Sequence, residues 1–209
     1  MDKIVVIGGG GHAKVVISIL KKINTYEIVG YTDVKNRGEI LVVQYLGSDS
    51  VLKNLYKNGI KNAVLGLGFI ESNKKRKNVL KEISNIDFNY PAIISNNAVI
   101  NEDVTTGMGT VIMDGVVINA GTKIGKFCII NTRSSIDHDC MIKNHTHIAP
   151  GVTLSGGVEI GNNVLIGAGA TIIQYKKVVD NAIIGAGSTV VDDINEPGLY
   201  GGVPAKLLN

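Results

Sequence analysis

Residues 129–172 read IINTRSSIDHDCMIKNHTHIAPGVTLSGGVEIGNNVLIGAGATI, and every sixth residue in this stretch is Ile or Leu. The aliphatic column runs from Ile94 to Val190 without an insertion, and Thr106 is its one exception. An amphipathic helix cannot hold this phase, because its side chains repeat every 3.6 residues. The pattern instead indicates short strands with a turn every six residues.

A second column lies four residues after each aliphatic position. Its members are Ala, Ser, Cys, Thr or Val, apart from Lys176 and Ile194. Hexapeptide repeats of this kind form parallel β-helices, in which three repeats make one coil of about 18 residues. We expect the aliphatic side chains inside a triangular prism, and each coil stabilised by the coils stacked on it. Cys128 and Cys140 are separated by two hexapeptide repeats and fall on different sides of the prism, so we expect no disulfide between them.

The overall composition agrees with a strand-rich chain. The 209 residues include 29 Ile and 24 Val against 13 Leu, with 5% aromatic residues and no Trp. These numbers disfavour a helical bundle, and the 44% hydrophobic content excludes a disordered chain. No apolar run reaches about 18 residues, so we expect no membrane partner. The chain starts directly with a strand-like run instead of a signal peptide, which predicts a cytoplasmic protein.

Charge is unevenly distributed along the chain. Residues 1–90 hold 14 Lys and Arg against 8 Asp and Glu, whereas residues 91–209 hold 7 against 10. This asymmetry, together with the onset of the repeat, predicts two domains that meet near residue 90. The basic residues are too sparse to predict nucleic-acid binding.

The first domain alternates predicted strands and helices, which is typical of parallel βαβ units and a Rossmann-like fold. We expect strands over residues 3–7, 27–31 and 62–67, and helices after residue 14 and over residues 50–58 and 73–84.

A glycine loop, Gly8-Gly9-Gly10-Gly11, joins the first strand to the first helix. Such loops let backbone N–H groups approach a phosphate at the start of a helix. With Ala13 and the downstream Asp33, the loop also fits a loose dinucleotide fingerprint. A dinucleotide fold needs two such halves and only one fits here, which favours a mononucleotide or nucleotide-sugar site. The alternative is that the glycines only permit tight packing of helix on strand.

Three of the four histidines cluster in the middle of the repeat, at His138, His145 and His147. His138 lies at an exposed position between Asp137 and Asp139. A carboxylate beside an imidazole raises its pKa and orients the ring, which suits a general base. The alternatives are an exposed turn histidine with incidental neighbours and a zinc site. The histidine spacing gives zinc no support, and we expect no metal.

The motifs GGGGHAKVV, YTD, NTRSSIDHDC and the closing GGVPAKLL, combined with the repeat, resemble one family. It is the family of NeuD-like sialic acid O-acetyltransferases, and within it the nucleotide-4-amino-sugar N-acetyltransferases, the PglD-like enzymes. The resemblance implies a left-handed β-helix, a homotrimer, acetyl-CoA as the donor and active sites between subunits.

The same resemblance assigns expected roles to individual residues. His138 matches the catalytic base and Asp139 the acid beside it, while Asn131 has a supporting role in the substrate site. Residues expected to bind acetyl-CoA are His147, Ala168 and Ala186. Residues expected to bind the nucleotide sugar are Gly10, Gly11, His12, Asp33 and Arg76. The chain departs from the family pattern at Val34 and at Gly68-Phe69-Ile70, which leaves the nucleotide and the sugar open.

We therefore expect N-acetylation of the 4-amino group of a UDP- or dTDP-linked 4-amino-4,6-dideoxy sugar, used in bacterial surface glycans. The alternatives are a sugar O-acetyltransferase, acting for example on sialic acid, and a prism that only binds or scaffolds a partner.

Overall fold

The computed structural model describes residues 1–70 and 74–208. The chain forms two compact units, Met1–Ser95 and Asn96–Asn209. Each unit is described by itself below.

The first unit is built on a four-stranded parallel sheet, ordered β3-β2-β1-β4. Its strands are β1 (Asp2–Ile7), β2 (Tyr26–Thr32), β3 (Tyr45–Gly47) and β4 (Asn62–Leu65). The predicted strands are confirmed with bounds shifted by up to two residues. β3 was not predicted, because three residues are too short to show a periodic pattern.

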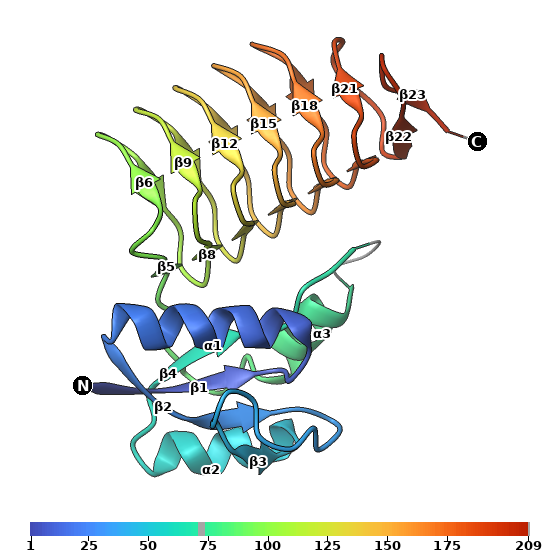
Figure 1. Ribbon diagram of the computed structural model, residues 1–209. Coiled ribbons are helices and arrows are strands. Elements are labelled where there is room, and N and C mark those ends of the chain that lie inside the picture. Colours follow the sequence, from blue (N-terminus) through green and yellow to red (C-terminus); the bar gives the residue numbers. More distant parts are fainter. Residues whose placement is uncertain (71–73, 209) are drawn as a thin grey trace. The chain divides into compact units, whose positions relative to one another are not determined.

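Helices cover both faces of this sheet, α1 on one face and α2 on the other (Figure 1). They are α1 (Gly11–Ile23), the 3₁₀ turn η1 (Asp49–Val51), α2 (Leu52–Lys57) and α3 (Lys74–Glu82). The predicted helix over 73–84 is confirmed from Lys74, and residue 73 lies outside the described residues. The core centres on β1, whose residues 4–7 are fully buried. The Rossmann-like βαβ arrangement predicted from alternating patterns is therefore present.

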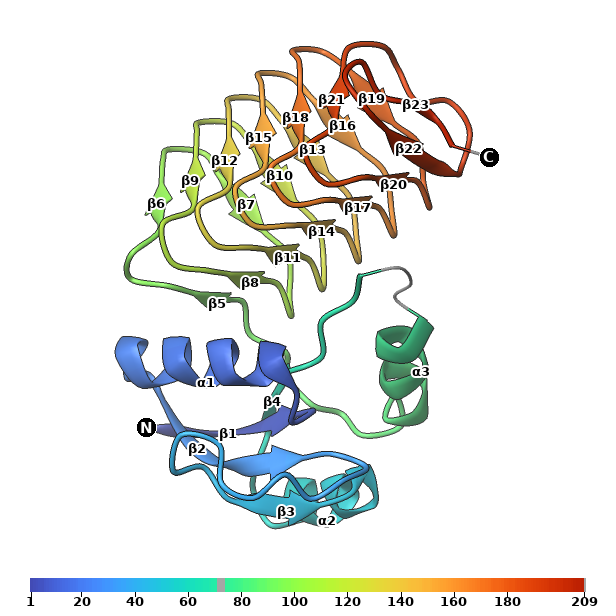
Figure 2. The ribbon, with the colours of Figure 1, turned by 45° about the vertical axis from the view of Figure 1, so that its right-hand side comes forward.

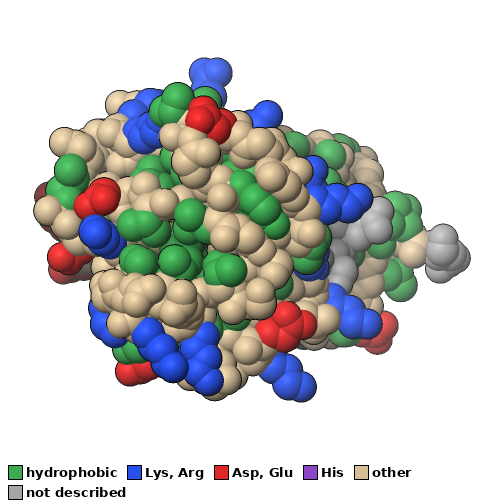
Figure 3. All heavy atoms as spheres, turned by 90° about the horizontal axis from the view of Figure 1, so that it is seen from below, with side chains coloured by type: hydrophobic (Ala, Val, Ile, Leu, Met, Phe, Trp, Pro, Cys, Tyr) green, Lys and Arg blue, Asp and Glu red, His purple; other side chains and the backbone are tan. Residues whose placement is uncertain are grey.

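Lys and Arg side chains of the first unit are scattered over its surface. Figure 3 views the molecule from below, where basic side chains lie apart around the rim and apolar ones show between them. The positive charge of this part of the chain therefore does not form one continuous patch on the face in view.

The second unit is a left-handed β-helix with three flat faces (Figure 2). We name each face after one strand. The β12 face contains β6 (Val99–Ile100), β9 (Val117–Ile118), β12 (Ser135–Ile136), β15 (Thr153–Leu154), β18 (Thr171–Ile172) and β21 (Thr189–Val190). The β13 face contains β7 (Thr105–Thr106), β10 (Lys123–Ile124), β13 (Met141–Ile142), β16 (Glu159–Ile160) and β19 (Lys177–Val178).

The β14 face contains β8 (Val111–Ile112), β11 (Ile129–Ile130), β14 (His147–Ile148), β17 (Leu165–Ile166), β20 (Ile183–Ile184) and β22 (Leu199–Gly201), which pairs with β23 (Lys206–Leu207). One further strand, β5 (Ile93–Ile94), precedes the prism in the chain.

Strands stack in parallel, and each residue pairs with the equivalent residue of the next coil, as Ile130 does with Ile148 and Ile136 with Leu154. The predicted aliphatic column points inward, and Ile130, Ile136 and Ile148 are fully buried. The small residues of the second column are buried too. Cys128 and Cys140 are among them, and these two described residues form no disulfide, as expected.

Corners of the prism carry a second regularity, which the sequence reading did not identify. Every sixth residue from Asp103 to Gly187 has a positive φ. Eleven of these fifteen residues are Gly, Asn or Asp, the residue types that tolerate this left-handed conformation. The exceptions are Phe127, Arg133, His145 and Tyr175.

Candidate active site

His138 stands on the corner that follows β12, between the β12 face and the β13 face. We call this corner, residues 137–140 with their counterparts one and two coils away, the His138 edge. Asp139 is the residue with positive φ there, at 58°. The sharp turn projects the His138 side chain outward, and 51% of it is exposed. Its imidazole is therefore accessible to a ligand lying along this edge.

The His138 ring is paired with the next residue along the chain. Its Nδ1 lies 2.8 Å from Oδ2 of Asp139. This hydrogen bond is the main reason why the pKa of His138 is raised above its ordinary value, and the charge of Asp137 adds to the effect. Because Nδ1 is engaged, Nε2 is the nitrogen left to exchange a proton with a substrate.

Asp137 supports the same corner from the other side. Its Oδ1 accepts hydrogen bonds from the backbone N–H of His138 at 2.8 Å and from Nδ2 of Asn119 at 2.9 Å. Oδ1 of Asn119 in turn accepts a hydrogen bond from Nδ2 of Asn101 at 2.8 Å. The bond from Asn119 is the main reason why the pKa of Asp137 is lowered. Sequence reasoning missed this ladder, although each member lies one full coil from the next.

Gly156 lies one coil further along the His138 edge, directly against the imidazole. A Cβ at this position would stand 2.5 Å from Nε2 and 2.7 Å from Cε1 of His138. The three closest atoms to that Cβ all belong to the His138 ring. The absence of a side chain at residue 156 therefore makes the space in which the imidazole lies.

Asn131 and His147 come together on a different corner, between the β14 face and the β12 face. We call this corner, residues 131–134 with their counterparts one or more coils away, the Asn131 edge. Nδ2 of Asn131 lies 3.1 Å from Nε2 of His147, which is 9% exposed. Oδ1 of Asn131 accepts the backbone N–H of Thr132 at 2.8 Å. This bond fixes the orientation of the amide, so Nε2 of His147 is an acceptor and the ring carries its proton on Nδ1.

Ala168 and Ala186 lie on the Asn131 edge too, two and three coils above Thr132. Both are exposed. The carbonyl of Ala168 accepts the N–H of Gly187 at 2.9 Å, as in the regular coil-to-coil stacking. The structure thus places Ala168 and Ala186 on the edge at which the ring of His147, a residue of β14, meets Asn131. The His138 edge is one side of the prism away, on the order of 15 Å at about 3.3 Å per extended residue.

The glycine loop of the first unit leads from β1 to the start of α1. Gly10 caps the helix without a side-chain hydrogen bond. A Cβ at Gly10 or at Gly11 would meet no atom within 4 Å, so the positions that side chains would occupy at these two residues are open. His12 follows in the first turn. The loop has the open backbone that a phosphate requires.

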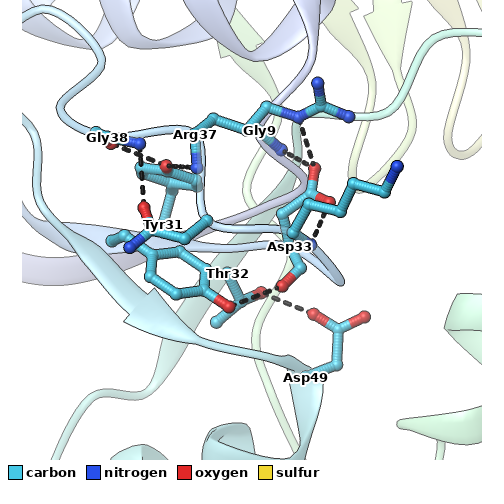
Figure 4. Close-up of polar contacts among 10 residues, drawn as sticks. Gly9, Tyr31, Thr32, Asp33, Arg37, Gly38 and Asp49 are labelled. Atoms are coloured by element: carbon cyan, nitrogen blue, oxygen red, sulfur yellow. Dashed lines mark hydrogen bonds and ion pairs between the residues drawn. The ribbon is translucent and has the colours of Figure 1, made fainter.

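Asp33 holds this loop from the end of β2 (Figure 4). Its Oδ2 accepts the N–H of Gly9 at 2.8 Å and lies 3.5 Å from Nε of Arg37, while Oδ1 accepts the N–H of Lys35 at 3.1 Å. Burial raises the pKa of Asp33, but the hydrogen bonds from Lys35 and Gly9 and the charge of Arg37 outweigh it. The net pKa is lowered, so the carboxylate stays ionised. Arg37 was not predicted as a site residue, because no sequence motif distinguishes a single exposed arginine.

Other polar groups around Asp33 are fixed by the fold. Oγ1 of Thr32 donates to Asp49 at 2.6 Å, and the hydroxyl of Tyr31 donates to the carbonyl of Gly38 at 2.7 Å (Figure 4). A hollow beside them is lined by Gly8, Asp33, Val34, Asp49, Lys75 and Leu67. Arg76 lies on α3, is 2% exposed and donates from Nη1 to the carbonyl of Leu67 at 2.6 Å. It anchors the segment that follows β4.

Comparison with known proteins gives the same two parts. The family model of the PglD N-terminal domain matches residues 3–83. The model of the bacterial transferase hexapeptide, with six repeats, matches residues 121–156 and 139–174. No curated protein sequence matches the chain.

Solved structures resemble the chain over its whole length. A variant of perosamine N-acetyltransferase from Caulobacter crescentus, in complex with CoA and GDP-perosamine, is 33% identical and matches with a TM-score of 0.93. The match covers 100% of this chain and 98% of that one. This chain belongs to the PglD-like family of nucleotide-sugar N-acetyltransferases.

A second PglD-like relative is the acetyltransferase domain of PglB from Neisseria gonorrhoeae. It is 31% identical, with a TM-score of 0.90 and 100% of both chains covered. The same domain in complex with acetyl coenzyme A is 30% identical, with a TM-score of 0.88, and 99% of this chain and 98% of that chain are covered. The PglD-like family explains why the glycine loop and the prism occur in one chain.

Two observations bear on other kinds of chemistry, at a metal ion and at a cysteine nucleophile. Among the described residues, no group of three or more His, Cys, Asp or Glu is arranged to hold a metal ion. Burial raises the pKa of the Cys140 thiol, which opposes formation of a thiolate nucleophile.

No helix within residues 1–70 and 74–208 is long and apolar enough to cross a membrane.

Proposed function

We propose that this protein transfers the acetyl group of acetyl-CoA to the 4-amino group of a nucleotide-activated 4-amino-4,6-dideoxy sugar. The observation that carries the proposal is the His138–Asp139 pair, with an exposed ring whose Nε2 lies over Gly156, in a chain that matches nucleotide-sugar N-acetyltransferases over its full length. We place the reaction in the cytoplasm and its product in bacterial surface glycan synthesis.

His138 is the general base of this reaction, a role that requires its neutral form. The neutral amine of the sugar attacks the thioester carbonyl carbon, and Nε2 of His138 accepts the proton that the nitrogen loses. Asp139, bonded to Nδ1 at 2.8 Å, stabilises the imidazolium that forms. The tetrahedral intermediate collapses, the C–S bond breaks and the imidazolium returns the proton to the sulfur of CoA.

The acetyl donor lies along the Asn131 edge. Ala168 and Ala186 are exposed on adjacent coils, which suits an extended pantetheine arm running along the prism. The ring of His147 lies with Nε2 3.1 Å from Nδ2 of Asn131, and either this residue or a backbone N–H stabilises the developing oxyanion. The acetyl group must nevertheless reach His138, which lies on the next edge.

That separation supports a homotrimer in which each active site is formed by two chains. The Asn131 edge of one chain supplies the donor site and the His138 edge of its neighbour supplies the base. Cyclic symmetry makes three such sites equivalent. Mixed trimers provide the test. Coexpression of His138→Ala with His147→Ala chains is expected to restore part of the activity that each variant lacks alone.

The acceptor nucleotide binds at the glycine loop in residues 1–90, and residues 91–209 carry the transfer chemistry. Gly10 and Gly11 approach the phosphates, His12 stands in the first turn of α1, and Asp33 fixes the loop. Arg76 holds the segment after β4 at the same site. The relative solved with GDP-perosamine extends the nucleotides worth testing beyond UDP and dTDP.

The deciding experiment measures release of CoA thiol with UDP-, dTDP- and GDP-linked 4-amino sugars and with free sialic acid. We expect release only with an amino sugar. Release with sialic acid alone would instead support the alternative, a sugar O-acetyltransferase. His138→Ala is expected to lower kcat by at least about a hundredfold, the usual contribution of a general base. Activity near wild type in that variant would refute the assignment.

A further inference from the structure

Tyr175 occupies a position that its residue type does not favour. It belongs to the corner column in which every sixth residue has a positive φ, and its own φ is 59°. A bulky side chain in the left-handed region is an outlier that calls for a reason. Asp103, Gly121, Asp139 and Gly157, the other residues of this column on the same edge, are all Gly or Asp.

Two of the other three exceptions are explained by packing of one ring on another. Phe127 and His145 stack on each other, with ring centroids 5.5 Å apart and an angle of 4° between the rings. The third, Arg133, lies against Gly115 of the preceding coil, where an added Cβ would stand 3.1 Å from Cγ of Arg133. The Tyr175 ring lies against Gly157, where a Cβ would be 2.5 Å from Cδ1, yet 70% of Tyr175 is exposed. Packing within the chain therefore uses little of this ring.

The ring stands on the same edge as the proposed base. Gly156 and Gly157 are consecutive residues. The His138 imidazole lies against the first and the Tyr175 ring against the second. Two residues without side chains thus separate two rings that come from the coils on either side. Any ligand that reaches Nε2 of His138 along this edge from the C-terminal side passes Tyr175.

The position of Tyr175 along the prism axis indicates which ligand its ring would contact. Tyr175 and Ala168 lie on the same coil, between β17 and β19. In a trimer whose axis is parallel to the prisms, the same coils of neighbouring chains lie at the same height. Tyr175 of one chain then faces the Ala168 level of the next, where the donor lies.

We infer that Tyr175 lines the acetyl-CoA groove and packs its ring on the pantetheine arm bound to the neighbouring chain. The inference rests on the proposed function, because it takes the donor site from it. The methylene and methyl groups of pantetheine are apolar, and an exposed aromatic ring offers them a contact surface.

The test compares CoA binding by wild type, Tyr175→Asn and Tyr175→Phe, using isothermal titration with CoA alone. Asn tolerates the left-handed corner, so Tyr175→Asn is expected to keep or raise the Tm. We expect its Kd for CoA and its KM for acetyl-CoA to rise roughly tenfold, the loss of one good aromatic contact. Tyr175→Phe keeps the ring and is expected to stay within about twofold of wild type.

Phe127→Asn is the matched control, because it also replaces an aromatic residue at a left-handed corner but on the edge that carries no candidate residue. It is expected to lower the Tm and leave the Kd for CoA unchanged. A wild-type Kd in Tyr175→Asn, or a rise only in the KM for the amino sugar, would overturn the inference. If wild type binds CoA but acetylates no amino sugar, the proposed function fails, while the CoA titration still decides the role of Tyr175.

Discussion

The imidazole of His138 rests on Gly156, the residue one full coil further along the chain. A Cβ on Gly156 would approach Nε2 to 2.5 Å, and its closest neighbours would all be atoms of that ring. The nitrogen that we propose to exchange the proton is therefore positioned by a missing side chain on the next coil.

Gly156→Ala is accordingly expected to displace the imidazole while leaving the coil intact. Since the exposed ring can move aside, we expect the Tm to stay within a few degrees of wild type. The kcat for acetyl transfer should fall by roughly tenfold or more, because a base moved by about 1 Å loses its alignment. Steady-state kinetics and thermal unfolding give both quantities.

Two further variants isolate this effect. In a His138→Ala background, Gly156→Ala should change kcat no further, because the ring it displaces is absent. Gly161→Ala is the structural counterpart, since its Cβ would stand 2.5 Å from the backbone nitrogen of Asp180 and should lower the Tm. Wild-type kcat in Gly156→Ala would show that the position of the ring is not set there.

The pH dependence of activity follows from the His138–Asp139 bond. The raised pKa of His138 places the acidic limb of the pH profile above the ordinary imidazole value, because the base works only when neutral. Asp139→Asn removes the charge that favours the imidazolium. The limb of kcat/KM should then move to lower pH, and kcat at its plateau should fall. An unmoved limb would mean that another group titrates.

The Asn101–Asn119–Asp137 ladder predicts that two asparagine variants affect the pKa of Asp137 differently. Asn119→Ala removes both the donor to Asp137 and the acceptor for Asn101, and it should lower the free energy of unfolding by about 2 kcal/mol, at about 1 kcal/mol for each hydrogen bond. It should also raise the pKa of Asp137, whose main lowering contact it deletes. Asn101→Ala serves as the control, because it removes a rung and leaves the bond to Asp137. Urea unfolding and NMR titration of Asp137 distinguish the two.

Asp33→Ala is expected to loosen the glycine loop. The variant leaves the N–H of Gly9 without its 2.8 Å partner, so the loop loses its fixed shape. The KM for the nucleotide sugar should rise about tenfold, as loss of one charged hydrogen bond of about 1.5–3 kcal/mol allows. The KM for acetyl-CoA should not change. Equal changes in both constants would argue against a separate nucleotide site.

The pair proposed to be catalytic, His138 and Asp139, could be recognised in the sequence because its members are adjacent. His138 stands between two aspartates in the middle of a regular repeat. Because adjacent residues are close together in any fold, their interaction can be inferred without a structure. Gly156 and Asn119 were missed for the opposite reason. Each lies one coil from its partner, and glycine and asparagine are common at such corners.

Tyr175 can be recognised as an exception only when it is known which residue of each six-residue repeat has a positive φ. The left-handed column precedes the small buried column by one residue, and its preference for Gly, Asn and Asp is visible in the printed sequence. Without the backbone angles, the column of small residues was the more obvious pattern, and the sequence did not single out Tyr175.

The sequence by itself determined the prism, the inward aliphatic column, the βαβ unit with its glycine loop and the adjacent pair His138–Asp139, because these depend on short-range periodicity and neighbouring residues. Only the tertiary structure decided that Asp33 holds Gly9, that Asn131 sets the tautomer of His147 and that Gly156 lies under His138. These contacts join residues that are far from adjacent in the chain, and stacking of coils and strands brings them together only when the chain has folded.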